Sequence, residues 1–127
     1  MRLVLLANAA QAAALHLDTP QGLRAVAAFA DGIAPAKELV VADNGALPRA
    51  TALVRNAHAA GLFVHVYTLR PENAFLPARW KKPPAKDGAV RGDSAGEIRS
   101  YLDAGVDGFF TDDPATGRAA ISPNAGK

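Results

Sequence analysis

The sequence contains no cysteine, which excludes a disulfide framework and thiolate chemistry. Aromatic residues make up only 6% of the chain, and 14 Lys and Arg residues against 12 Asp and Glu residues leave a net charge of just +2. So small a surplus does not predict nucleic-acid binding. The one basic cluster, at residues 79–82, is interpreted as a solvated loop face. No apolar stretch has the distribution of a membrane span.

What is present fits one compact domain over residues 1–127, since half of the residues are hydrophobic and 20% are charged. The amino terminus allows two interpretations. Met1-Arg2 followed by small and apolar residues is compatible with a secretory signal. Asn8 and Gln11 interrupt the apolar stretch, however, and residues 3–6 are equally typical of a covered strand, which is the interpretation we favour.

The rest of the chain is organised around residues 58–77, where a helix ends, a strand runs and a polar loop begins. Gly61 stands where a helix end favours a left-handed residue. Residues 62–69 are apolar at both alternating sets of positions, which predicts a parallel strand covered on both faces. Covered parallel sheets bind ligands at the carboxyl ends of their strands, so the long loop after this strand, about residues 71–93, is the predicted functional region.

Strand and helix signals alternate along the remaining sequence. Thr19 and Pro20 predict an N-cap and a first helical residue, and Ser94 with Glu97 predicts a capping box. About four strand-helix repeats predict an α/β fold with a parallel sheet and right-handed crossovers. The predicted strands are 3–6, one of 32–34 and 39–41, 62–69 and 106–111, and the predicted helices are about 20–30, 48–60, 94–104 and 114–121, before a frayed tail.

Neither a glycine-rich phosphate loop nor a paired-ligand metal motif occurs in the sequence. Gly105 and Gly108 are too sparse for a dinucleotide fingerprint. Gly105 is better explained as a helix stop and Gly108 as a site of close backbone packing.

Two segments, HAAGLFVHVYTLRPENAFLP at 58–77 and AGVDGFFTDDP at 104–114, with GDSAGE at 92–97 between them, resemble the glycerophosphodiester phosphodiesterase family, most closely its bacterial periplasmic or secreted branch. FADGIAPAK at 29–37 is similar to that family's sixth strand, and RLVLL at 2–6 to its fifth. The resemblance covers about residues 2–121.

This resemblance implies an eight-stranded (β/α) barrel of the TIM type that cleaves glycerophosphodiesters to glycerol 3-phosphate and an alcohol, in lipid and glycerol metabolism. It also implies a divalent cation, calcium or magnesium, two histidines as general acid and base, and a periplasmic or secreted location. The family's histidines and acidic ligands lie on its first three strands. This sequence has no His-Arg-Gly motif, no early Glu-x-Asp pair and no His-Asp that follows one.

The chain is therefore interpreted as strands five to eight, a half-barrel without the family's catalytic residues or metal ligands. By resemblance, the candidate substrate-binding residues are Tyr67, Arg70, Asn73, Phe75 and Phe110. Relatives place Tyr or Trp against the glycerol moiety at the position of Tyr67, and the alternative role of Tyr67 is barrel packing. Arg70 is expected to make a bidentate contact with a phosphate oxygen, and its alternative is a salt bridge to Glu72 or Asp93. Phe75 and Trp80 either cover the pocket or anchor the loop. Leu5 departs from the Gln that relatives often carry.

The remaining ionisable residues are interpreted as structural. His16 is placed in a linker, His58 near a helix end, and His65 as a hydrogen-bonded core residue rather than a ligand. Asp107, Asp112 and Asp113 suggest a metal site, but we favour a cap at Asp113 and an ordered turn at Asp112.

Two functions remain open after the sequence analysis. The chain is either a piece of the phosphodiesterase that becomes active in a complete barrel, or a non-catalytic binding or structural module. Its expected partner is the missing amino-terminal half or a second copy.

Overall fold

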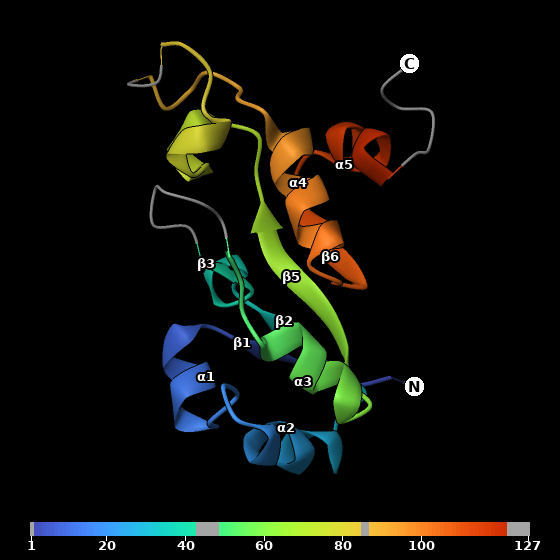
Figure 1. Ribbon diagram of the computed structural model, residues 1–127. Helices are drawn as coiled ribbons and strands as arrows, with labels where there is room; N and C mark the ends of the chain where they lie inside the picture. Colours follow the sequence, from blue (N-terminus) through green and yellow to red (C-terminus); the bar gives the residue numbers. More distant parts are fainter. Residues whose placement is uncertain (1, 43–48, 85–86, 122–127) are drawn as a thin grey trace.

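Four parallel strands form the central sheet of the protein in a computed structural model that describes residues 2–42, 49–84 and 87–121 (Figure 1). Their order across the sheet is β1 (Val4–Ala7), β2 (Gly32–Pro35), β5 (Phe63–Leu69) and β6 (Gly108–Thr111). The sequence of helices and parallel strands confirms the predicted α/β class and matches part of a TIM-type barrel.

Helices pack against one face of this sheet and enclose the core. Ile33, Val64 and Val66 of the sheet belong to one buried cluster with Val54 of α3 and Ile98 of α4. None of the described helices is both long and apolar enough to cross a membrane. The helices are α1 (Ala9–Ala14), α2 (Pro20–Ala27), α3 (Leu53–Ala59), α4 (Ser94–Asp103) and α5 (Pro114–Ile121).

Several helix boundaries follow from local sequence signals. Thr19 caps α2 by accepting a hydrogen bond from the Gly22 N–H at 3.1 Å. Gly61 and Gly105 have φ angles of 84° and 99°, which are the left-handed conformations that glycine adopts most easily. Residues 4–7 form the predicted first strand, and the sequence reasoning did not anticipate the short helix α1 that follows.

The predicted start of the third helix was wrong. Pro48 lies outside the described residues, and Arg49–Ala50 forms a short strand, β4, that pairs antiparallel with β3 (Val41–Ala42). Helix α3 therefore begins at Leu53. Of the two candidate strands, residues 32–35 enter the main sheet, and a 3₁₀ turn at Lys37–Leu39 leads into β3.

The predicted capping box of α4 was also wrong. The N-cap is Asp93, whose Oδ1 accepts a hydrogen bond from the Gly96 N–H at 2.8 Å. Glu97 reaches instead to Lys37, which lies 60 residues earlier in the chain. A local sequence pattern could not reveal a partner at that distance.

The second face of the sheet is open, which corrects the expectation that strand 62–69 is covered on both sides. Along β5, Val64 and Val66 are buried, whereas Phe63, His65 and Tyr67 alternate with them and are half-buried. Leu6 of β1 and Phe110 of β6 lie on the open face and are 57% and 50% exposed. We call the side chains of Val4, Leu6, Phe63, His65 and Phe110 the open face.

Glycines make room for the rings on the open face. A Cβ atom on Gly108 would lie 2.9 Å from Cδ2 of His65, and one on Gly32 would lie 2.3 Å from Cε1 of Phe63. Gly108 does mark a site of close packing, but the predicted backbone neighbour was wrong, because the nearest atoms belong to the side chain of His65.

Candidate functional site

A cleft of about 380 Å³ opens where β2 and β5 end, at the carboxyl edge of the sheet. Of the five candidate residues, Tyr67, Arg70 and Phe75 line it together. The rest of its wall consists of Ala36, Lys37, Glu38, Thr68 and Ala74. The structure thus brings three predicted site residues to the edge where parallel sheets bind ligands.

An irregularity in β5 directs two consecutive side chains into this cleft. Val66 pairs with Phe109 and Leu69 with Thr111, so β5 has one more residue than β6 in this interval. Tyr67 and Thr68 both line the cleft, and Leu69 returns to the core with no exposure.

Arg70 is held by an aromatic ring and a carboxylate. Its guanidinium carbon lies 4.7 Å from the centre of the Phe75 ring, and its Nε lies 3.5 Å from Oδ2 of Asp112. The salt-bridge partner is therefore Asp112, not Glu72 or Asp93 as the alternative role proposed. The Arg70 side chain remains 42% exposed beside the cleft, so its guanidinium can also contact an anion there.

Lys37 forms part of the cleft wall but is only 8% exposed. Its ammonium group donates to the carbonyl of Phe75 at 2.7 Å and to Oε2 of Glu97 at 2.8 Å. Sequence reasoning missed this residue. The available signal was a lysine two residues after a short covered strand, where a buried charge requires a partner.

The loop after β5 is stabilised from within by Asn73, which is fully buried. Its amide exchanges hydrogen bonds with the backbone of Lys82, at 2.7 Å to the carbonyl and 3.0 Å from the N–H. Asn73 does not line the cleft, and its contact with substrate stays a prediction. Trp80 packs against the start of α4, where its ring would touch a Cβ on Gly96, so it anchors the loop.

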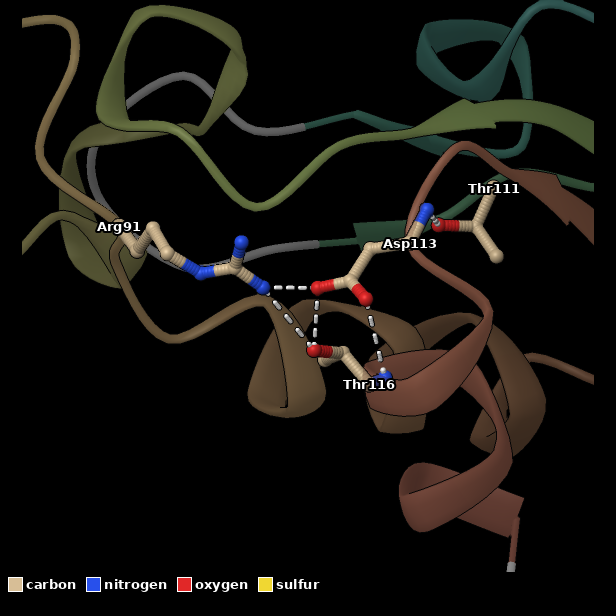
Figure 2. Close-up of polar contacts among 4 residues, drawn as sticks. All are labelled: Arg91, Thr111, Asp113 and Thr116. Atoms are coloured by element: carbon tan, nitrogen blue, oxygen red, sulfur yellow. Dashed lines mark hydrogen bonds and ion pairs between the residues drawn. The ribbon is translucent and has the colours of Figure 1, made fainter.

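Asp113 caps the start of α5, as the structural interpretation predicted, whereas the turn-ordering role of Asp112 stays a prediction. Figure 2 shows the Asp113 carboxylate between Arg91 and Thr116, and its Oδ2 accepts from the Thr116 hydroxyl at 2.6 Å. The Asp113 N–H in turn donates to Oγ1 of Thr111 at 3.1 Å. The hydrogen bonds from Thr116, together with Arg91, lower the pKa of Asp113 below the ordinary Asp value.

Asp107 belongs to the opposite, amino-terminal edge of the sheet. Its Oδ2 lies 2.7 Å from Nε2 of His58 and accepts the Val64 N–H at 2.9 Å. Partial burial acts to raise the pKa of Asp107, but these two hydrogen bonds outweigh it, and the pKa is lowered from 3.8.

None of the three histidines lines the cleft. His65 packs its ring 4.6 Å from that of Phe63 and 6.3 Å from that of Phe110, and no hydrogen bond of its ring is found within the described ranges. The expected hydrogen-bonded core histidine was therefore wrong. His16 lies between α1 and α2, beside a separate cavity of about 420 Å³ that holds no candidate site residue.

Phe110 lies on the open face and not in the cleft, so its role in substrate binding also stays a prediction. Leu5 packs against the helix-covered core, away from the open face.

The carboxylates near the cleft do not suit a divalent cation. Asp112, Asp113 and Glu97 each face a basic side chain, and Glu38 in the cleft wall is a single carboxylate. No three potential ligands gather in the part of the chain that the structure describes. The residues present here do not fit a metal centre.

Residues 3–116 match the model of the glycerophosphoryl diester phosphodiesterase family. A relative from Arabidopsis thaliana, named glycerophosphodiester phosphodiesterase GDPD6, is 39% identical over 83 residues. The matched segment is 64% of this chain but 20% of the plant protein. The chain thus spans about a fifth of that relative's length.

Proposed function

Because the chain belongs to the glycerophosphoryl diester phosphodiesterase family, we propose that it supplies the substrate-binding half of a barrel that hydrolyses glycerophosphodiesters. Hydrolysis adds water, breaks one P–O bond and releases glycerol 3-phosphate and an alcohol. The observation that carries the proposal is the shared cleft of Tyr67, Arg70 and Phe75 at the carboxyl edge of the sheet.

In this proposal the residues of the cleft bind and orient the substrate. Arg70 donates to a phosphate oxygen, since its guanidinium matches the geometry of a phosphate and its side chain is 42% exposed beside the cleft. Tyr67 places its ring and hydroxyl against the glycerol group. Phe75 supports the guanidinium from beneath, at 4.7 Å.

The general acid, the general base and any calcium or magnesium ion are assigned to another polypeptide segment. His58 is paired with Asp107 and His65 lies between two rings, so neither reaches the cleft. We assign these groups to an amino-terminal half-barrel that packs on the open face. A second copy would cover the same face but would bring no catalytic histidine to the cleft.

A second candidate function is that of a non-catalytic half-barrel module. The open face favours it, because an apolar surface of this kind usually marks a contact with another protein.

On the family resemblance we further propose a bacterial periplasmic or secreted protein, which cell fractionation with an antibody to the chain would test.

The decisive experiment measures release of glycerol 3-phosphate from glycerophosphocholine with added calcium or magnesium. The chain is assayed alone and mixed with the amino-terminal half of a family member. We expect turnover in the mixture and none from the chain alone. A soluble complex of the two halves without turnover would favour the non-catalytic module, and metal-dependent turnover by the chain alone would contradict the half-barrel proposal.

A further inference from the structure

Lys37 joins three parts of the chain that are far apart in sequence. It follows β2, and its ammonium group contacts the carbonyl of Phe75 in the loop after β5 and the carboxylate of Glu97 in α4. Lysine is almost never buried without partners, and here both partners lie within 2.8 Å. The desolvation penalty of a buried ion pair often exceeds the free energy gained from the attraction of its charges. Stability alone therefore does not explain why Lys37 is buried beside Glu97.

The contact with Phe75 connects Lys37 to the proposed anion site. Phe75 ends the 3₁₀ turn Asn73–Phe75, and its exposed ring lies beneath Arg70. Asn73, at the other end of this turn, is bonded to the backbone of Lys82 and Val90, within the same loop. Lys37 therefore provides a polar link between this turn and the sheet.

We propose that Lys37 is a positioning residue for anion binding: it fixes Phe75, and through the Phe75 ring it holds the Arg70 guanidinium toward the cleft. The inference rests on the proposed function, because it assigns Arg70 to a phosphate group. Lys37 itself does not contact the phosphate, since its ammonium is directed to Phe75 and Glu97.

The test compares the wild-type chain with Lys37→Met/Glu97→Gln. The single change Lys37→Met would leave the Glu97 carboxylate buried without its cation and would threaten folding. The double change removes both charges, keeps similar side-chain shapes and deprives the Phe75 carbonyl of its donor. His58→Gln is the matched control, because it removes the imidazole that bonds to Asp107 at the opposite edge of the sheet.

The first measurement needs no ligand. Nuclear Overhauser contacts between the Arg70 side chain and the Phe75 ring should be present in the wild type and in His58→Gln, and lost in the double variant. Retained contacts in the double variant would overturn the proposal, because Lys37 would then have no effect on the Phe75 ring.

The second measurement titrates the same three proteins with inorganic phosphate. The wild type should bind in the millimolar range, since one guanidinium supplies a charge-assisted contact or two. Loss of the support from Phe75 should weaken binding by about two- to fivefold in the double variant alone.

The nuclear Overhauser contacts and the phosphate titration together distinguish failure of the proposed function from failure of the positioning role of Lys37. A wild type that binds no phosphate would contradict the proposed function, while the Arg70–Phe75 contacts would still report on Lys37. Loss of phosphate binding with those contacts intact would show Lys37 to be a direct ligand, which also overturns the positioning role.

Discussion

Tyr67 illustrates how one residue can be assigned either to packing or to substrate. Its ring is half-buried beside the cleft, on the same face of β5 as Phe63 and His65. Tyr67→Phe keeps the ring and removes only the hydroxyl. We expect an unchanged melting temperature and, in a completed barrel, a Michaelis constant for glycerophosphodiesters raised by about two- to tenfold. An unchanged Michaelis constant would reassign the hydroxyl to packing.

We expect Asp107 to make the stability of the chain depend on pH. Because the pKa of Asp107 is lowered in the folded state, its ionised form stabilises the fold above the ordinary value of 3.8, and this contribution is lost as the pH falls through the lower folded value. Asp107→Asn removes the charge but keeps an oxygen that can accept the Val64 N–H. The free energy of unfolding should therefore differ between wild type and variant at pH 6, and the difference should shrink below about pH 4.

Urea titrations of both proteins at pH 6, 4 and 3 measure this difference. His58→Gln serves as the control that keeps the bond from Val64 and loses the imidazole. An equal difference between wild type and Asp107→Asn at all three pH values would show that the Asp107 charge contributes nothing.

At the scale of the element, α4 is capped by a neighbouring residue, Asp93, while its Glu97 bonds to the distant Lys37. Asp93→Ala removes the N-cap acceptor of Gly96 and should lower the free energy of unfolding by about 0.5–2 kcal/mol. Ser94→Ala is the matched control, since the Ser94 hydroxyl is buried but has no hydrogen-bond partner within the described ranges. The free energies of unfolding of both variants, measured at equilibrium, show whether Asp93 or Ser94 caps α4. A larger loss from Ser94→Ala would restore the Ser94 capping box.

Elements set by neighbouring residues could be predicted from the sequence, and those set by distant partners could not. Thr19 with Pro20, and the glycines at 61 and 105, carry their signal locally, and these boundaries are confirmed. The start of α3 depends on pairing between β3 and β4, which the proline signal at residue 48 did not reveal.

The residues of the candidate site likewise fall into a group that could be predicted from the local sequence and a group that could not. The strand-end position of Tyr67, Arg70 and Phe75 could be predicted, because β5 and its loop are contiguous in sequence. Lys37 and Asp112 could not, since each reaches the site from another strand. The half-buried state of His65 was missed because the prediction assumed a sheet covered on both faces.

At the scale of the whole molecule, the open face leaves apolar side chains of a parallel sheet exposed in the isolated chain. Parallel sheets are almost always covered on both faces, and here Val4, Leu6 and Phe110 are substantially exposed on one of them. The strands β1 and β6 also form the two edges of the sheet. We therefore expect the isolated chain to self-associate through the open face, and an added amino-terminal half to compete with that association.

Sedimentation velocity tests this central claim most directly, with the wild type, Phe110→Lys and Phe29→Lys compared over a range of concentrations. Phe29 is 57% exposed and follows α2, outside the sheet, so it controls for the loss of an exposed ring. We predict concentration-dependent association of the wild type and of Phe29→Lys, and a monomer for Phe110→Lys. A wild-type chain that stays monomeric at high concentration would contradict the account of an incomplete barrel.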